Sequence, residues 1–306
     1  MTTSPEPPAS PAGRQRLARA VQQLADGLSF SRAKRAVTEG QVLVDGEVQR
    51  DPGFWVEPPA KVEWDRQRRA DRTPAWLKVE LLHADDDVAV AAKPAGLLSM
   101  PTPEREKDTL LSRIALQVTK SRGHRPFLAV VHRLDRDTSG LVAFATSRRG
   151  ETSLSAQLLD RSMSRIYDVI AAGELAGESG TFDQALIGDG LMRKRWVAHP
   201  GEAGKPSVTH WRLVERLAGA TRLRVALESG RTHQIRIHLA AAGHPVLGDS
   251  LYFAGGGAAP LRPDLGRLAL HAAELAFRHP ADGRAMKFVT PLPGDLERLI
   301  TSLRQS

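Results

Sequence analysis

Residues 131–145 read VHRLDRDTSGLVAFA and join a dense group of polar side chains to an apolar run. The first ten residues of this stretch hold two carboxylates, two arginines, one histidine and two hydroxyls. Apolar runs bounded by polar turn residues predict buried strands, here over 127–131 and 141–146. A charged loop that buried strands hold at both ends can fix a reactive group rigidly. We therefore expect residues 132–140 to form a functional loop.

The composition is that of a basic globular protein. The chain has 306 residues, of which 41% are hydrophobic, and its net charge of +8 indicates a polyanionic partner. The lack of cysteine excludes disulfides, thiolate zinc sites and a cysteine nucleophile, and it fits a reducing cytoplasm. No apolar run reaches the length that spans a bilayer. We expect a cytoplasmic monomer without membrane contact.

The first part of the chain predicts a tail and a small domain. Residues 1–13 are rich in Pro, Ser and Thr, which predicts a disordered tail. Within residues 14–65, apolar residues at helical spacing predict a first helix, and Ser31 is expected to cap a second. The pair Asp45-Gly46 between alternating residues predicts a β-hairpin.

A charged linker, residues 66–75, is expected to lead into a larger domain over 76–306. The acidic triplet at 85–87 predicts a solvated turn rather than a metal site, because contiguous carboxylates alternate faces. Lys93, in a Lys-Pro-x-Gly turn, is expected to have a structural role. Apolar runs predict strands at 77–83, 88–92, 164–173, 204–214 and 222–227, and helical spacing predicts helices at 109–120, 149–159 and the C-terminal end.

A second polar signature, ESGRTHQIRIHL at residues 228–239, follows one of these strands. Thr232 is expected to cap a helix whose apolar members stand at i and i+4. His233 and His238 are five residues apart and lack the pattern of a zinc-binding helix, so no metal site is expected.

The loop HRLD at 132–135, with TSG at 138–140, resembles the catalytic loop of RluA-type RNA pseudouridine synthases. Ordered matches along residues 76–292 support the resemblance, since one loop matches by chance more easily than a whole domain. They are KPAG at 93–96, Arg165 and Tyr167 in one strand, GKPSVTH at 204–210, SGRTHQIRIHL at 229–239 and LGDSLY at 247–252.

The resemblance implies an α+β fold, with a mixed, mostly antiparallel central sheet flanked by helices. It implies an isomerase that converts uridine in RNA to pseudouridine, with large-subunit ribosomal RNA as the expected substrate and transfer RNA as an alternative. The reaction needs no redox change or phosphoryl transfer, so no cofactor is expected. Two further alternatives are a non-catalytic RNA-binding or ribosome assembly factor and a glycoside hydrolase that uses Asp135 and Asp137.

The resemblance also implies a set of catalytic residues. By motif position Asp135 is the essential carboxylate, and carboxylates act beside the anomeric carbon in glycoside cleavage as well. Whether Asp135 attacks the sugar or removes a proton from it stays open. Asp137 does not fit this position, because the family pattern places the aspartate directly after His-Arg-Leu, and it is interpreted as structural. Arg231 would pair with Asp135 and keep it ionised, and Tyr167 would stack on the uracil and act on a proton of the base.

Other side chains are expected to bind RNA. Arg133 would displace the target base or hold its phosphate while the uridine is flipped out. His132 either supports this step or forms a hydrogen bond within the loop. The two helices and hairpin of residues 14–65 resemble the alpha-L RNA-binding fold, in which Arg32, Lys34 and Arg35 would face RNA phosphates. The alternative for these three residues is a solvated helix face.

Overall fold

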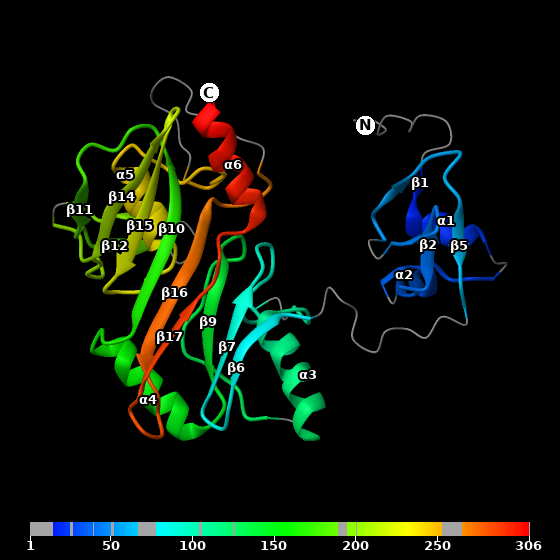
Figure 1. Cartoon of the computed structure of the whole chain (residues 1–306), viewed down its shortest axis with the longest axis horizontal. Coiled ribbons are helices and arrows are strands. Elements are labelled where there is room, and N and C mark those ends of the chain that lie inside the picture. The colour runs from blue at the N-terminus through cyan, green and yellow to red at the C-terminus, as the bar shows by residue number, and fades with distance from the viewer. Residues whose placement is uncertain are drawn as a thin grey trace, which may run out of the picture. The chain divides into compact units, whose positions relative to one another are not determined.

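The computed structural model describes residues 15–24, 27–38, 40–49, 52–66, 78–103, 106–124, 126–188, 195–199, 201–252 and 265–305. The chain divides into two compact units, Met1–Lys78 and Val79–Ser306, each of which is described by itself (Figure 1). The predicted tail and all but Arg66 of the predicted linker lie outside the described residues. Among the described residues, no helix combines the length and hydrophobicity that crossing a bilayer requires.

The first unit consists of two helices and short strands around an aliphatic core. Its elements are β1 (Gln15–Arg16), α1 (Leu17–Gln23), α2 (Phe30–Thr38), β2 (Val42–Val44), β3 (Glu47–Val48), β4 (Trp55–Val56) and β5 (Val62–Trp64). Strands β3, β2 and β5 form an antiparallel sheet in that order, and β1 pairs with β4. The buried core includes Leu17, Val21, Ala33, Val37, Val42 and Val56.

Local turn chemistry explains how this unit is built. The predicted hairpin is confirmed: Asp45 and Gly46 have φ values of 53° and 84°, as a type I′ turn requires. The prediction that Ser31 caps the second helix is wrong, because α2 begins at Phe30 and the Ser29 hydroxyl accepts the Arg32 N–H at 3.3 Å. The helix turns its alanines and Val37 into the core and leaves three basic residues exposed, namely Arg32, Lys34 and Arg35.

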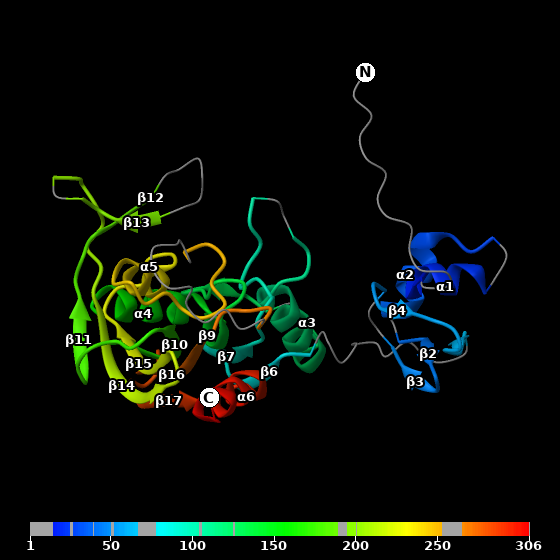
Figure 2. The same cartoon turned by 90° about the horizontal axis from the view of Figure 1, so that it is seen from above.

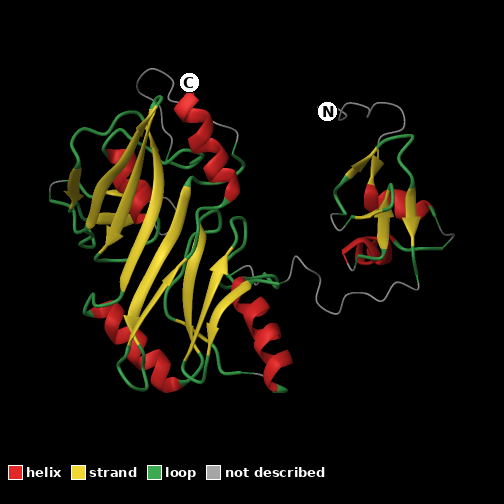
Figure 3. Ribbon diagram, in the orientation of Figure 1, coloured by secondary structure: helices red, strands yellow, loops and turns green. Residues whose placement is uncertain are grey.

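The second unit is built on a ten-stranded sheet of the predicted kind (Figure 3). The strand order is β11 (Ser179–Phe182), β14 (Thr209–Leu217), β15 (Ala220–Leu227), β10 (Ser164–Ala172), β16 (Leu270–Arg278), β9 (Ser139–Ala145), β7 (Val88–Lys93) and β6 (Glu80–Ala84). In addition, β17 (Ala285–Val289) pairs with β16 and β8 (Ala129–Val130) pairs with β9. All of these pairs are antiparallel except β9 with β16, which are parallel.

Helices flank this sheet. A separate two-stranded hairpin covers one of these helices. The helices are α3 (Leu110–Arg122), α4 (Arg148–Leu159), α5 (Gln234–Ala241) and α6 (Gly294–Gln305). The hairpin of β12 (Leu186–Gly188) and β13 (Arg195–Val197) lies over α5 (Figure 2). There Leu186 packs with Ile237 of α5 and with Tyr252 in one small apolar cluster.

Strand β9 follows the loop that contains Asp135 and is buried on both faces. Leu141, Ala143 and Ala145 pack into one core cluster together with Leu154 of α4. The alternate residues, Val142 and Phe144, pack into a different cluster that includes Leu110 and Ile114 of α3. The uninterrupted apolar run is therefore the mark of a strand covered on both sides, and it anchors the preceding loop.

Gly140 is required where β9 and β16 meet in parallel. Its φ of 115° and a pairing with Ala272 bring the two backbones very close. A Cβ atom at this position would lie 2.2 Å from the carbonyl oxygen of Ala272. No other residue fits here without moving one of the strands.

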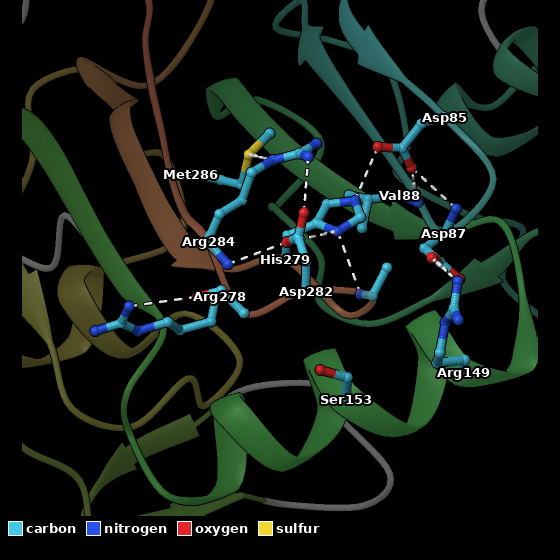
Figure 4. A network of polar contacts seen from close by, with 12 residues as sticks. Asp85, Asp87, Val88, Arg149, Ser153, Arg278, His279, Asp282, Arg284 and Met286 are labelled. Carbon is cyan, nitrogen blue, oxygen red and sulfur yellow. Dashed lines mark hydrogen bonds and ion pairs between the residues drawn. The ribbon is translucent and has the colours of Figure 1, made fainter.

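The turn between β6 and β7 is more than the solvated turn that the sequence predicted (Figure 4). The Asp85 carboxylate accepts the backbone N–H groups of Asp87 and Val88 at 2.9 Å, and it lies 2.9 Å from the imidazole Nε2 of His279. Asp87 is buried and pairs with Arg149 at the start of α4. Buried carboxylates require such partners, and they join three turns at one end of the sheet.

A metal-binding arrangement occurs in the same place. Ligand atoms of His83, Asp85 and His279 all lie within 4.8 Å of one another. However, both imidazole Nε2 atoms are at hydrogen-bond distance from the same Asp85 oxygen, 2.6 and 2.9 Å. Hydrogen bonding within the group therefore accounts for its compactness.

Candidate active site

Three distant segments meet around a cavity of about 280 Å³. They are the loop at 131–138, the start of β10 with Arg165 and Tyr167, and the segment 227–236 that leads into α5. Of the residues predicted for the catalytic domain, His132, Arg133, Asp135, Tyr167 and Arg231 all line this cavity. Arg32, Lys34 and Arg35 belong to the other unit.

The backbone on both sides of Asp135 is fixed. The Ser99 hydroxyl accepts the N–H of Leu134 and donates to its carbonyl oxygen, at 3.0 and 2.8 Å. On the other side, the Lys93 ammonium donates to the carbonyl oxygen of Arg136 at 2.8 Å. Asp135 lines the cavity, whereas Asp137 is exposed and does not, because the chain turns at residues 136–137.

The structural role expected of Lys93 is confirmed. Its side chain is buried and donates to the carbonyl oxygens of Pro94, Leu97 and Arg136. Burial lowers the pKa of this lysine to about 7, and the nearby carboxylates of Asp135 and Asp137 limit the decrease. Lys93 thus joins the turn at 93–97 to the Asp135 loop.

The cation beside Asp135 is Arg236, and the predicted pairing with Arg231 is wrong. Nη1 of Arg236 lies 3.1 Å from Oδ2 of Asp135. The remaining edge of the guanidinium, Nε and Nη2, binds both oxygens of Asp249 at 2.6 and 2.9 Å. Burial opposes the charge of Arg236, but the two carboxylates raise its pKa above the ordinary value.

Arg231 lies at the exposed rim of the cavity instead. It precedes α5, and its backbone N–H donates to Oε1 of Gln234 at 3.0 Å. The predicted cap, Thr232, is also wrong: His233 occupies the N-cap position of α5 and makes no capping hydrogen bond. A signal for Arg236 was present in the sequence, since an arginine between two isoleucines on a buried helix needs a buried carboxylate.

His132 holds the loop against the sheet. Its Nε2 accepts the backbone N–H of Ala143 in β9 at 3.0 Å. Burial and the positive charge of Arg165 lower the pKa of His132 to about 3, so the imidazole is neutral at physiological pH. This bond joins the loop to strand β9 and is not the predicted hydrogen bond within the loop; the part of His132 in displacing the base stays a prediction.

An aromatic and a second buried cation complete the cavity wall. Tyr167 is only 6% exposed, and burial raises the pKa of its hydroxyl, so the phenol is neutral. Arg165 is also buried, and its Nε has no hydrogen-bond partner in the described structure. A Cβ on Gly230 would lie 2.5 Å from Nη1 of Arg165, so the glycine of this signature makes room for the guanidinium.

The cavity therefore combines one carboxylate, an aromatic ring and apolar side chains from Leu227, Ile235 and Leu270. Exposed arginines, Arg133 and Arg231, stand at its rim. Such a site can hold a flat ring with polar edges and place a carboxylate beside the group attached to it. The fold thus presents a cavity in which a single carboxylate, Asp135, lies beside the space for such a ring.

Comparison with known proteins identifies the family. The family model described as RNA pseudouridylate synthase matches residues 87–241. The "Ribosomal large subunit pseudouridine synthase D" of Pseudomonas aeruginosa is 36% identical over 96% of this chain and 93% of its own length. The protein of the same name from Pasteurella multocida is 34% identical over 95% and 91%. The chain belongs to the RNA pseudouridylate synthase family and is an RNA pseudouridine synthase, an isomerase.

Solved structures show the same fold at low sequence identity. Human RNA Pseudouridylate Synthase Domain Containing 4 aligns with a TM-score of 0.60 at 21% identity, covering 74% of this chain and 93% of that one. Human RNA Pseudouridylate Synthase Domain Containing 1 aligns with a TM-score of 0.57 at 22% identity, covering 75% and 96%. These similarities confirm the predicted pseudouridine synthase fold.

Proposed function

We propose that this enzyme isomerises uridines in large-subunit ribosomal RNA and that Asp135 is its essential carboxylate. The observation that carries the proposal is the Asp135–Arg236 ion pair at 3.1 Å inside the cavity. The substrate assignment rests on relatives named for the large ribosomal subunit, which match this chain over more than nine-tenths of their length. Because such RNA is cytoplasmic, we also place the enzyme there, acting as a monomer.

The reaction breaks the bond between N1 of uracil and C1′ of ribose and forms a bond between C5 and C1′. The C5 proton leaves and N1 gains a proton, so the overall change is an isomerisation. Asp135 would act at the sugar, either as nucleophile or as base, in its ionised form. Arg236 donates to Oδ2 of Asp135 at 3.1 Å and sets a positive charge beside it. The buried Tyr167 would stack against the uracil during its turnover.

The exposed arginines have a different task in this proposal. Arg133 and Arg231 stand at the cavity rim, where the phosphates that flank a flipped uridine would lie. Flipping a base out of a helix costs a few kcal/mol, roughly, and contacts to the backbone offset that cost. In the first unit, Arg32, Lys34 and Arg35 share one exposed helix and would add phosphate contacts.

The test is replacement of Asp135 by asparagine, which keeps the shape of the side chain and removes its charge. Asp135→Asn should abolish pseudouridine formation in ribosomal RNA fragments, measured by carbodiimide mapping, and leave RNA affinity nearly unchanged. Undiminished product with the purified variant would refute the role of Asp135.

The RNA target is tested separately. Pseudouridines would be mapped in total RNA from cells with and without the protein. Loss of a large-subunit site supports the proposal, and loss of a transfer-RNA site instead would replace the proposed substrate. No loss at any site, together with binding of the purified protein to RNA, would support an assembly factor.

A further inference from the structure

His233 lies near the carboxylate of Asp135, on the side of the oxygen that Arg236 does not contact. Its Nε2 lies 3.8 Å from Oδ1 of Asp135, whereas Arg236 contacts Oδ2. Both residues belong to the start of α5, and both line the cavity. The two oxygens of Asp135 are thus flanked by two nitrogen groups from one short segment. The chemistry proposed for Asp135 does not use this imidazole.

The backbone of His233 is held in an uncommon conformation. Its φ of 60° and ψ of 17° are left-handed, a region that costs a non-glycine residue about 1 kcal/mol or more. The residue makes no capping hydrogen bond that would explain this conformation. Strain of this kind persists where the surrounding structure enforces it, and it gathers at functional sites. Here it turns the imidazole toward Asp135.

Tyr252 fixes the orientation of the ring. Its hydroxyl lies 2.9 Å from Nδ1 of His233, and the two rings meet edge to face with centroids 5.5 Å apart. Tyr252 is itself buried, and its backbone N–H donates to the Asp249 carboxylate that binds Arg236. The short segment from Asp249 to Tyr252 therefore supports both groups that face Asp135.

The contacts also select the position of the imidazole proton. Burial raises the pKa of Tyr252, so its hydroxyl carries a proton, and the backbone N–H of Arg195 acts on the same oxygen as a donor. The hydroxyl is then free to donate to Nδ1 of His233, which leaves the ring proton on Nε2. That proton faces the carboxylate of Asp135, whereas the other tautomer would set a lone pair against it.

We infer that His233 is a positioning residue for the reaction: it donates its Nε2 proton to Oδ1 of Asp135, while the Tyr252 hydroxyl holds the required tautomer. This inference rests on the proposed role of Asp135. The present 3.8 Å is longer than a hydrogen bond, and contacts of this kind shorten when substrate fills the pocket. With Arg236 on Oδ2 and His233 on Oδ1, the carboxylate is fixed in one orientation beside the sugar.

The test compares two substitutions at His233. His233→Gly removes the imidazole and suits the left-handed backbone, so relief of backbone strain should offset much of the stability lost with the Tyr252 contact. It should lower kcat roughly 10- to 100-fold, the equivalent of one hydrogen bond to a charged group, with KM for RNA within about twofold. His233→Gln supplies an amide N–H and should recover part of kcat.

The pH profile separates positioning of Asp135 from a general effect on folding. A carboxylate that loses a donor is protonated more easily, so the acidic limb of kcat/KM should move to higher pH in His233→Gly and less in His233→Gln. The titratable and charged groups facing this imidazole are Asp135, Arg236, Asp249, Tyr252 and Arg195. All of them remain in both variants.

Tyr252→Phe deletes only the hydroxyl and should lower kcat about tenfold with the same direction of the pH shift. His199→Gln, an exposed histidine away from the cavity, is the matched control and should behave as wild type. Wild-type kcat and pH profile in His233→Gly, with Asp135→Asn inactive, would overturn this inference alone. An active Asp135→Asn would overturn the proposed function itself.

Discussion

Arg236 is buried between two carboxylates, and its planar guanidinium serves both at once. Nε and Nη2 bind Asp249 side by side, which leaves Nη1 for Asp135. Binding both carboxylates at once depends on the planar guanidinium of arginine, which presents several N–H donors in fixed directions. The ammonium group of lysine has only one nitrogen. Asp249 thus sets the position of Arg236, and Arg236 sets the position of Asp135.

Arg236→Lys should therefore keep the charge and still lose activity. We expect kcat to fall by about 100-fold, because the ammonium group cannot bind Asp249 in the bidentate manner and reach Asp135 as well. Arg231→Ala, at the exposed rim, should mainly raise KM. Single-turnover and steady-state kinetics on one RNA fragment would separate the two effects. Equal kinetic behaviour of the two variants would contradict the division of roles between these arginines.

At the scale of elements, the active loop depends on how β9 is held in the sheet. The strand is buried on both faces and meets β16 in parallel at Gly140, five residues after Asp135. At the opposite end of the strand, Thr146 binds the backbone of the β6–β7 turn, where Asp85 and Asp87 lie. Packing at both ends of β9 thus determines where the loop ends.

Gly140→Ala should destabilise the protein strongly. The new Cβ would meet the Ala272 carbonyl oxygen at 2.2 Å, so strand β9 or β16 must move. We expect a loss of at least about 3 kcal/mol in the free energy of unfolding, measured by urea denaturation. Gly123→Ala is the control, since Gly123 also has a positive φ but open space around it, and it should cost only about 1 kcal/mol. If both substitutions lower the free energy of unfolding by similar amounts, the close approach of β9 and β16 at Gly140 would be contradicted.

Asp85 should make the free energy of unfolding depend on pH in the acidic range. Burial works against its ionised form, but hydrogen bonds from the Asp87 and Val88 amides and from two histidines bring its pKa well below the usual value. As the pH falls, Asp85 is protonated in the unfolded chain before it is protonated in the folded protein. The stabilisation by its charge is therefore present above about pH 4 and is lost as the pH falls further.

Asp85→Asn tests that dependence. At pH 7 the variant should be less stable by about 1.5–3 kcal/mol, because hydrogen bonds to a charged group are lost. The difference from wild type should shrink as the pH is lowered from about 4 toward 2. Urea denaturation over this range measures it. A difference that stays constant with pH would show that the charge of Asp85 is not what matters.

At the scale of the whole molecule, two compact units divide the proposed work. Every residue proposed for chemistry belongs to the unit Val79–Ser306, and the basic helix α2 belongs to Met1–Lys78. Phosphate contacts supply affinity that depends on salt, without taking part in bond making. The identity of the first unit as an RNA-binding domain remains a prediction.

Replacing Arg32, Lys34 and Arg35 together by glutamine tests that prediction in the full chain. RNA affinity should fall and the slope of its logarithm against the logarithm of salt concentration should become shallower, because fewer counterions are released. The rate constant at saturating RNA should stay near wild type. Filter binding at several salt concentrations measures the slope. An unchanged slope and affinity would favour the solvated helix face.

The sequence by itself determined the features that depend on neighbouring residues. The position directly after His132-Arg133-Leu134 distinguished Asp135 from Asp137, and the pair Asp45-Gly46 specified its turn. The ordered motifs specified the fold and the family. Each of these follows from the identity and order of residues that are close in the sequence or from local turn chemistry.

Only the tertiary structure decided which distant groups pair. Arg236 is 101 positions from Asp135, and His279 is 194 positions from Asp85. The way α5 docks against the sheet brings Arg236 to the carboxylate and leaves Arg231, five residues earlier, at the rim. Local patterns carry no record of that docking, because partners for buried charges are selected when separate elements pack together.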